Sequence, residues 1–297
     1  MKRVLIFYFS GTGNTKEVAD MIASSLRNAG TETDCYAIDI CVKKGIVPDV
    51  SGADAIGIGY PIYAFNAPGL VESFLKKLPL AKGLPAFVFK TAGEPLSINN
   101  ASSFWIHCIL KKKGYRLMYE RHFLMPYNIK FRFPDEVVKQ IYTLSKKLAV
   151  KLAYDFMQGI SDGPRYNLPA LLVAWIMLVF RPLAKFNGKM YKVSGQCTQC
   201  QKCIRGCPMG NICLREGKII FGWKCTMCMH CVMYCPQGAM HAGWIDGLSV
   251  RGGYNFERIM NDEGIKADTI QKYKKGFYTL FKKYIKKMEA ITENTAQ

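Results

Sequence analysis

Two cysteine runs of identical spacing constrain this chain more than any other feature. Each run reads C-x2-C-x2-C-x3-C-P, and the second repeats the first after 28 residues. The eight cysteines are Cys197, Cys200, Cys203 and Cys207, and then Cys225, Cys228, Cys231 and Cys235. Three thiolates two residues apart can surround one face of a cubane iron–sulfur cluster, and the cysteine beside the proline reaches a second cluster. The pattern therefore predicts two 4Fe-4S clusters and a chain that carries electrons.

A pair of zinc ribbons is the alternative for so many cysteines. Zinc sites use two C-x-x-C pairs that lie well apart, and a third cysteine in each run has no role in them. The duplicated spacing therefore favours iron–sulfur clusters. Cys213 lies outside the pattern and is expected to be a small apolar packing residue. His230, between two ligands, is expected to face solvent without a role.

Residues 188–245 resemble the bacterial two-cluster ferredoxins. The likeness rests on both cysteine runs with their prolines, and on Gly217 before a short predicted strand at 218–221. It implies crossed ligation between the two runs. One cluster would be held by Cys197, Cys200, Cys203 and Cys235, and the other by Cys225, Cys228, Cys231 and Cys207.

The first predicted strand, residues 2–9, runs directly into a loop of hydroxyls and glycines. The loop reads Ser10-Gly11-Thr12-Gly13-Asn14-Thr15 and opens a predicted helix at 14–28. Converging backbone N–H groups, hydroxyls and a helix N-terminus form a neutral phosphate cradle. The loop is neither a Walker loop nor the G-x-G-x-x-G of dinucleotide sites. A turn that only caps the helix is the alternative interpretation.

The loop matches the T/S-x-T-G-x-T pattern and so resembles the FMN phosphate loop of flavodoxins. Two further segments follow predicted strands at the carboxyl edge of the sheet, where ligands bind in such folds. The resemblance implies flavin contacts there, at Pro61, Ile62, Tyr63, Ala64, Phe65, Asn66, Thr91, Ala92 and Gly93. Tyr63 and Phe65 are expected beside the flavin ring, with packing in the core as the alternative.

The charge around these segments differs from that of flavodoxins, which ring the flavin with acids. Residues 55–71 carry no charge, and Lys16 and Lys90 stand near the loops against Glu94. Acids disfavour an anionic reduced flavin, so this chain is expected to disfavour it less.

Residues 1–158 alternate strand-like and helix-like segments, which predicts a flavodoxin-like α/β domain with a doubly wound, five-stranded parallel sheet. Strands are expected at 2–9, 32–40, 54–59, 85–91 and 115–124, and helices at 14–28, 68–78, 99–113 and 135–157. The crossover at 41–52 is expected to be abbreviated. The predicted organisation is an FMN domain at 1–158, a linker with an apolar helix at 159–187, a small α+β two-cluster ferredoxin domain at 188–245 and a basic helical extension at 246–297.

The linker and the extension each hold an apolar pattern with two interpretations. Leu168 to Phe180 is a 13-residue uncharged run, ended by Arg181-Pro182, and a membrane span needs about 20 such residues. A helix buried between the domains is favoured over a membrane-surface anchor.

Residues 272–288 contain seven lysines and no acid. On a helix, the apolar residues of this segment would share one face, formed by Phe277, Leu280, Phe281, Tyr284, Ile285 and Met288. Packing of this face on the protein itself is favoured over contact with anionic lipid or an acidic partner.

The net charge and the use of cysteine limit which partners and which cellular compartment the chain is expected to have. A net charge of +19 without a recognised nucleic-acid module favours an acidic redox protein such as a ferredoxin, or anionic lipid, over nucleic acid. The apolar run after Met1-Lys2-Arg3 is too short for a signal peptide. Ligand-spaced cysteines predict the reducing cytoplasm of an anaerobic cell, with peripheral contact at the inner face of the membrane as an alternative.

Together the motifs resemble the anaerobe-type flavodoxin–ferredoxin fusion proteins over residues 1–245. The resemblance implies an electron-transfer oxidoreductase that works between low-potential carriers and a substrate or partner, through FMN and two 4Fe-4S clusters. A terminal flavin reductase of quinone-like, nitro or azo compounds is one alternative. A non-enzymatic, membrane-docked electron carrier is another. No catalytic acid or base is predicted, since His107 and His122 lie on predicted elements and are expected to be structural.

Overall fold

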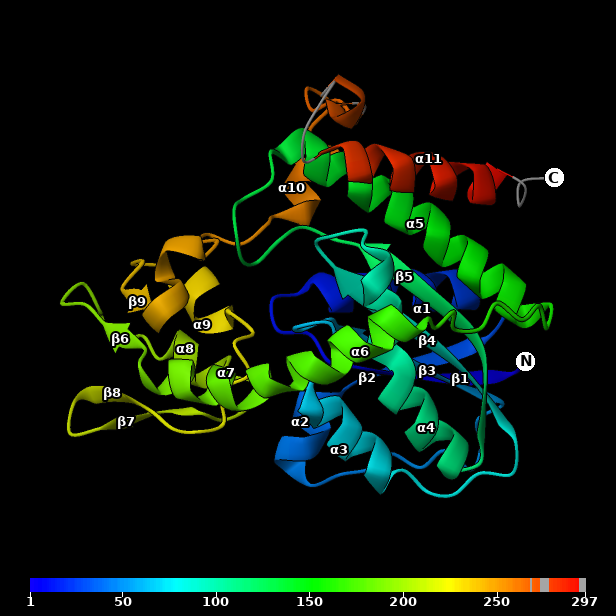
Figure 1. The fold of residues 1–297 in the computed structure, drawn as a ribbon, viewed down its shortest axis with the longest axis horizontal. Helices are drawn as coiled ribbons and strands as arrows, with labels where there is room; N and C mark the ends of the chain where they lie inside the picture. Colours follow the sequence, from blue (N-terminus) through cyan, green and yellow to red (C-terminus); the bar gives the residue numbers. More distant parts are fainter. Residues whose placement is uncertain (268, 273–277, 294–297) are drawn as a thin grey trace.

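The computed structural model describes residues 1–267, 269–272 and 278–293, and its first half is built on one parallel sheet (Figure 1). The strands are β1 (Arg3–Tyr8), β2 (Glu32–Ala37), β3 (Ala55–Pro61), β4 (Leu84–Ala92) and β5 (Tyr115–Leu124). They are hydrogen-bonded in the order β2-β1-β3-β4-β5, and every pair is parallel. The predicted doubly wound, flavodoxin-like sheet is confirmed.

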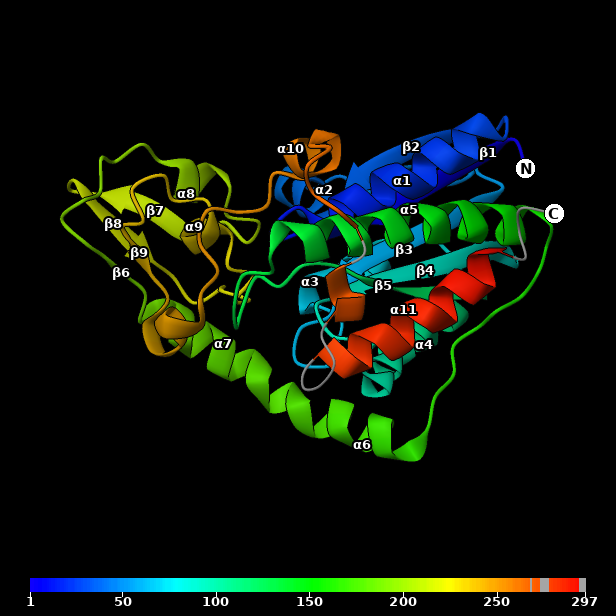
Figure 2. The same cartoon turned by 90° about the horizontal axis from the view of Figure 1, so that it is seen from above.

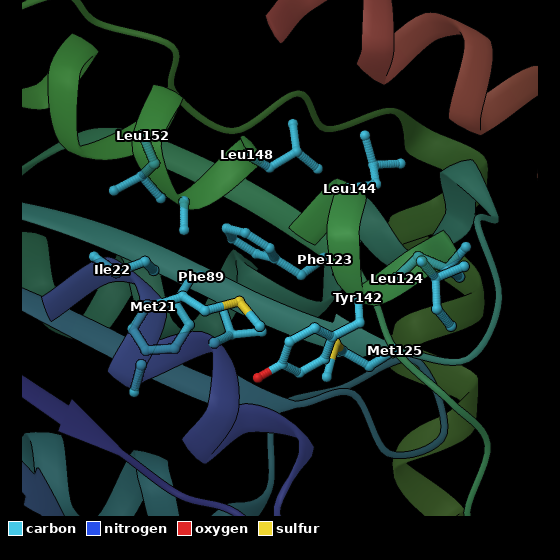
Figure 3. Packing of buried hydrophobic residues seen from close by; sticks show 14 of the residues in the cluster. Met21, Ile22, Phe89, Phe123, Leu124, Met125, Tyr142, Leu144, Leu148 and Leu152 are labelled. Atoms are coloured by element: carbon cyan, nitrogen blue, oxygen red, sulfur yellow. The ribbon is translucent and has the colours of Figure 1, made fainter. Parts of the chain in front are cut away.

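Helices cover both faces of the sheet because successive side chains of its strands point to opposite sides. On β1, Val4 and Ile6 join the core under α1 (Asn14–Asn28) and α5 (Asp135–Met157). Leu5 and Phe7 join the other core. That core is covered by α2 (Ile38–Lys44), α3 (Gly69–Lys77) and α4 (Phe104–Lys112), with the 3-10 helix η1 (Ser97–Ser103) before α4. Figure 3 shows leucines of α5 above aromatic rings of the sheet in the first core.

One predicted strand of this domain is too long. The strand predicted at 32–40 ends at Ala37, and α2 begins at Ile38. The alternating pattern continued past the true end of the strand, so it gave no signal for the change. The crossover is short as predicted, because Gly45 stops α2 with a left-handed φ of 67°.

The linker forms a rod along one edge of the molecule (Figure 2). It comprises α6 (Leu168–Ile176), the 3-10 turn η2 (Met177–Val179) and α7 (Phe180–Lys189). Arg181-Pro182 does not end it, because Pro182 lies in the first turn of α7, where a missing N–H costs nothing. Over the described residues it is the one helix long and apolar enough to cross a membrane, with a mean hydropathy of 1.6, yet only 11% of its apolar window is buried. The prediction that this helix is buried between the domains is therefore wrong.

The cysteine runs lie in a small α+β unit at the end of this rod (Figure 1). Its hairpin pairs β7 (Ile212–Arg215) with β8 (Lys218–Phe221), and Gly217 makes the turn with a φ of 71°. Two short helices, α8 (Lys202–Arg205) and α9 (His230–Met233), follow the cysteine loops, and β6 (Lys192–Val193) pairs with β9 (Met240–His241). Cys213 lies in β7 opposite Ile220, partly buried.

The C-terminal extension returns to the sheet domain. After η3 (Gly243–Leu248), α10 (Phe256–Asn261) and η4 (Thr269–Lys272), the helix α11 (Tyr278–Glu293) lies beside α5 (Figure 2). Phe281, Ile285 and Met288 are buried in the same core as α5. The helical tail is confirmed, and its apolar stripe packs on the protein itself. Phe277, Lys274 and Lys275 of the predicted helix lie outside the described residues.

Candidate functional site

The loop after β1 is built to accept an anion. Gly13 precedes α1 with a φ of 95°. No side chain in the described part of the chain caps the helix, so its first N–H groups are available to a ligand. The Ser10 hydroxyl accepts a hydrogen bond from the Gly13 N–H at 3.1 Å, which holds the loop in a tight turn. The Thr15 hydroxyl lies 2.8 Å from that of Thr91, at the end of β4. Loops from β1 and β4 are thereby locked together.

Two adjoining cavities open at this edge of the sheet. The smaller, of about 50 Å³, lies at the loop after β1, and we call it the phosphate cradle after its predicted role. The predicted residues that line it are Ser10, Gly11, Thr12, Asn14, Thr15, Pro61, Ile62, Tyr63, Thr91, Ala92 and Gly93. The larger, of about 790 Å³, which we call the ring cavity, shares Ile62, Tyr63, Ala92 and Gly93 with the cradle and adds Ala64, Phe65 and Asn66. Of the predicted flavin residues, Gly13 alone lines neither cavity and serves the turn instead.

The turn at 63–66 carries Phe65 to the ring cavity in a strained backbone. Ala64 and Phe65 have left-handed φ values of 46° and 57°. Residues other than glycine adopt this backbone conformation only at a cost in free energy. Tyr63 and Asn66 exchange backbone hydrogen bonds of 2.9 and 3.0 Å across it, as in a two-residue hairpin turn. The Asn66 amide also donates to the Ala174 carbonyl of α6 at 2.7 Å. Such strain, held from two sides, is typical of ligand-binding loops.

A third loop of the site was missed from the sequence. Pro126 and Asn128 line the cradle, and Asn128 also lines the ring cavity. The Asn14 amide donates to the Pro126 carbonyl at 2.7 Å, so this side chain fixes the third loop to the first. In the sequence, only the position of these residues could have indicated this loop, because they follow the end of β5 at the carboxyl edge of the sheet.

The charges expected near the flavin are paired away from it. Lys90 is buried and forms an ion pair with Glu120 at 2.6 Å, and its ammonium also donates to the Asn100 carbonyl. Burial lowers the pKa of Lys90, and Glu120 opposes that shift. Burial, and then the Lys90 charge, lower the pKa of the neighbouring His122 to about 3. Lys90 therefore adds little charge to the flavin loops, since Glu120 neutralises it within the sheet.

The two remaining charges named in the sequence also have partners. Lys16 pairs with Asp20 at 2.6 Å on the surface of α1. Glu94 pairs with Lys130, and both residues line the ring cavity. The flavin-facing loops therefore have little net charge.

The eight ligand-spaced cysteines surround two separate pockets. Cys197, Cys200, Cys203 and Cys235 line one, which we call the outer pocket. Cys207, Cys225, Cys228 and Cys231 line the other, the inner pocket. Each pocket thus takes three cysteines from one run and the fourth from the other, which is the grouping that crossed ligation requires.

The backbone of the two runs repeats along with the sequence. Gln199 and Gln201 have left-handed φ values of 53° and 58°, and Met227 and Met229, 28 residues later, have 53° and 66°. These turns aim backbone N–H groups at sulfur. The N–H of Gln199 lies 3.4 Å from Cys197 Sγ, and the N–H of Met227 lies 3.3 Å from Cys225 Sγ. Hydrogen bonds to thiolates stabilise their charge, so both pockets fit a cluster held by four cysteines.

Burial distinguishes the pockets. Cys200 of the outer pocket is exposed, whereas Cys207 of the inner pocket is buried. Burial raises the pKa of the Cys228 thiol to about 12, so thiolate at this position depends on a bound positive charge. Among the described residues no group of three or more His, Cys, Asp or Glu side chains is arranged to hold a single metal ion.

The inner pocket lies directly against the phosphate loop. A Cβ on Gly11 would lie 2.7 Å from Cys228 Cβ and 2.6 Å from the Tyr63 hydroxyl, so only glycine permits this approach. His230 Nδ1 lies 2.8 Å from the Gly11 carbonyl oxygen, and the Tyr234 hydroxyl donates to the Thr12 carbonyl at 2.7 Å. The prediction that His230 faces solvent is wrong, because the sheet domain docks on the face of α9 that carries it.

The inner pocket also borders the ring cavity. Met209, Cys225 and Thr226 line both. The Tyr63 hydroxyl is buried between them, and it has no hydrogen-bond partner among the described residues. Burial raises the pKa of Tyr63 well above its usual value, and Cys228 and Cys225 add to that shift. An unpartnered hydroxyl at the junction of cradle, ring cavity and cysteine pocket is the kind of group that a bound ligand satisfies.

A hydroxyl-rich phosphate cradle that opens into a ring cavity, beside two four-cysteine pockets, defines a flavin and iron–sulfur electron-transfer protein. Comparison with known families agrees. Residues 5–92 match the flavodoxin domain, and residues 189–236 match the 4Fe-4S dicluster domain. The chain thus joins a flavodoxin domain to a 4Fe-4S dicluster domain, as in a flavodoxin–ferredoxin fusion, and these domains imply a flavin, 4Fe-4S clusters and redox partners.

Solved structures similar to this chain include several flavodoxins. Oxidised flavodoxin 1 from Bacillus cereus is 19% identical, with 54% of this chain and 100% of that chain covered and a TM-score of 0.38. A flavodoxin from the domain Archaea is 15% identical, with coverage of 52% and 99% and a TM-score of 0.35. Rubredoxin oxygen:oxidoreductase from Desulfovibrio gigas is 19% identical, with coverage of 54% and 37% and a TM-score of 0.38. Among curated protein sequences, none matches the chain.

Proposed function

We propose that the chain is a cytoplasmic electron-transfer oxidoreductase that binds FMN and two 4Fe-4S clusters and works between low-potential carriers and a substrate or partner. The observation that supports this most is a series of contacts from the outer pocket to the ring cavity. Cys203 of the outer pocket packs in the same apolar cluster as Cys207 of the inner pocket, and the inner pocket adjoins the phosphate cradle and the ring cavity. Gly11 touches Cys228, and Cys225 lines both the inner pocket and the ring cavity. In such a series the clusters supply one-electron chemistry and the flavin supplies the change to a two-electron step.

The residues of the cradle favour FMN over larger flavins. Thr12 and Thr15 are buried hydroxyls at an uncapped helix N-terminus, which suits one terminal phosphate. The sequence offers no second nucleotide loop. Tyr63 and Phe65 would flank the ring, and residues 91–93 would close its other side. Mass spectrometry of the released cofactor tests the assignment, which FAD would overturn.

The outer pocket is the natural docking place for a protein donor. Cys200 is exposed there, and Arg205 donates to its carbonyl at 3.0 Å. Lys202 lies on the same short helix, α8. Exposed basic side chains around an accessible redox site attract an acidic carrier such as a ferredoxin over long range.

The ring cavity supports a second candidate function, the reduction of a small molecule at the flavin. Its volume of about 790 Å³ and its mainly apolar lining suit a planar organic acceptor. Phe65 and Trp223 offer aromatic faces there, and Lys185 and Lys224 are exposed at its border. Steady-state reduction of quinone, nitro and azo compounds would test this, with Phe65→Ala expected to raise KM more than it lowers kcat. No turnover with any of the three classes would refute it.

The proposed function is tested by a variant with one ligand removed from each pocket. Cys200→Ala with Cys228→Ala leaves three thiolates per pocket, which should hold iron poorly. FMN should remain bound, because the cradle lies on a separate sheet. In rapid mixing with reduced acidic ferredoxin, flavin reduction in the variant should fall to the background rate. The same rate as in the intact protein would show that the cysteine pockets are not on the route.

A further inference from the structure

The rod formed by α6, η2 and α7 presents its bulky apolar side chains to solvent. Six of them recur at helical spacing on one side, and we call them the outer stripe: Leu168, Leu172, Trp175, Val179, Leu183 and Phe186. Their exposed fractions range from 42% at Leu183 to 79% at Leu168. The stripe runs the length of the rod, 22 residues or about 33 Å at 1.5 Å per residue.

The opposite side of the rod makes the contacts with the protein, and the rod residues that are fully buried there are small or polar. Ala170 and Ala174 are buried against Ala101 of η1. Asn187 is buried at the other end, where its amide donates to the Ala242 carbonyl at 3.1 Å. A surface helix of a globular protein buries its apolar face and exposes its polar one. Here the buried positions are small or polar and most bulky apolar side chains are exposed, so the outer stripe is suited to another apolar phase.

The apolar surface continues onto the cluster domain. The ring centroid of Phe186 lies 5.3 Å from Trp244 and 6.2 Å from Trp223, and both tryptophans are more than half exposed. With Trp175, three of the four tryptophans of the chain lie on or beside the outer stripe. Tryptophan favours the boundary between lipid and water, because its ring is apolar and its N–H seeks a polar partner.

Charge indicates which surface the stripe meets. Residues 163–215 contain eight Lys and Arg and no Asp or Glu. Lys185 of α7, and Lys224 next to Trp223, are exposed. Two copies of the chain would bring like charges together if they packed stripe to stripe, whereas an anionic bilayer supplies both an apolar layer and a negative surface.

The rod is fixed to the sheet domain in a way that a spanning helix is not. Arg181 forms an ion pair with Glu72 of α3 in the middle of the rod. Asn66 holds the Ala174 carbonyl near its start. Spanning a bilayer would break these contacts and take Arg181 into hydrocarbon. A helix with one apolar face and one anchored face lies in the plane of the interface instead.

We propose that the outer stripe, together with Trp223 and Trp244, is a membrane-binding face that lies in the interfacial layer of an anionic bilayer. This attachment does not depend on the proposed redox function. It places the ring cavity, which Met177, Phe180 and Arg181 of the same rod help to line, next to the lipid surface.

Vesicle flotation of the intact, cofactor-loaded protein tests the proposal. The protein should float with vesicles of phosphatidylglycerol and phosphatidylcholine and stay in solution with pure phosphatidylcholine, and high salt should weaken the binding. Leu172→Ser with Val179→Ser should lower the partition coefficient about a hundredfold, because two large apolar side chains no longer enter the lipid. Ile46→Ser with Leu80→Ser, at exposed apolar positions outside the stripe, is the matched control and should bind like the intact protein.

Flavin and cluster absorbance per mole should stay unchanged in both variants, so that folding is checked separately. The proposal fails if the intact protein ignores anionic vesicles at low salt, or if the stripe variant binds as well as the control. It also fails if light scattering shows a dimer that only the stripe variant disrupts, since a second copy would then cover the stripe. Resistance of the vesicle-bound protein to an alkaline carbonate wash would show a spanning helix and equally overturn it.

Discussion

The outer and inner cysteine pockets have the same sequence pattern and the same backbone turns, yet they differ in what surrounds them. The outer pocket includes the exposed Cys200, whereas the inner pocket is buried between the phosphate loop and the end of α7. At that end, Gly188 leaves room for Cys225. Duplication supplied two equal sites, and docking on the sheet domain made them unequal. Under the proposed function, this difference would give protein partners access at the outer pocket and would keep the flavin beside the inner one.

The largest expected effect comes from removing one ligand from one pocket at a time. Cys228→Ser and Cys200→Ser should each lose about half of the iron, because each disables one cluster. With Cys228→Ser, flavin reduction should fall to background for both a protein donor and reduced methyl viologen. With Cys200→Ser it should fail for the protein donor and persist for the small one. Rapid-mixing absorbance with both donors measures this. If the two variants behaved alike with both donors, the outer and inner pockets would not differ in role.

A smaller effect is expected where the inner pocket meets the phosphate loop. Gly11→Ala pushes a methyl group against Cys228 and Tyr63. Overpacking of this kind costs about 1–3 kcal/mol, so the junction should loosen and intramolecular flavin reduction should slow. Gly195→Ala, near the outer pocket, is the control, because a Cβ there meets no atom of a described residue within 4 Å. Thermal denaturation followed by flavin release should show a lower midpoint for Gly11→Ala alone.

Charge reversal at the outer pocket should act on encounter with the partner. Lys202→Glu with Arg205→Glu is expected to slow association with an acidic ferredoxin about tenfold at low salt, because steering by the positive surface is lost. The effect should vanish near 1 M salt, where the Debye length is about 3 Å. Lys286→Glu with Lys287→Glu on α11 makes the same charge change elsewhere. If the α11 variant is the slower one, the partner docks at the tail.

The smallest effect is expected from one hydrogen bond at the junction. Tyr234→Phe removes the donor to the Thr12 carbonyl. A bond of this kind contributes about 1 kcal/mol, so intramolecular flavin reduction should slow by less than about tenfold. Tyr154→Phe, at a half-exposed position on α5, should leave the rate unchanged. A loss as large as that of Cys228→Ser would mean that Tyr234 does more than hold the two domains together.

The sequence predicted what depends on local pattern and missed what depends on docking. Continuous apolar strands and the helix at 14–28 appear with little change, because burial on both faces of a parallel sheet leaves a strong signal. The role of His230 depends on a carbonyl more than 200 residues away, and no local pattern encodes that contact. The rod was misjudged because an apolar run usually means burial, and only the structure shows which side of it faces the protein. Asn128 was missed because its loop contains no sequence motif, and only its place after β5 could have indicated a role.

The return of α11 to α5 gives the molecule a particular order of assembly. The segment between the end of α5 and the start of α11, about 120 residues, forms one long loop that contains the rod and the whole cluster domain. Closing so long a loop costs little more entropy than closing one half its size, since the cost grows only with the logarithm of length. In the chain, α11 nevertheless follows both cysteine runs, so both runs have left the ribosome before α11 can reach α5. Once it docks, the cluster domain is tethered at both ends and cannot swing away from the phosphate loop as a domain on a single hinge would.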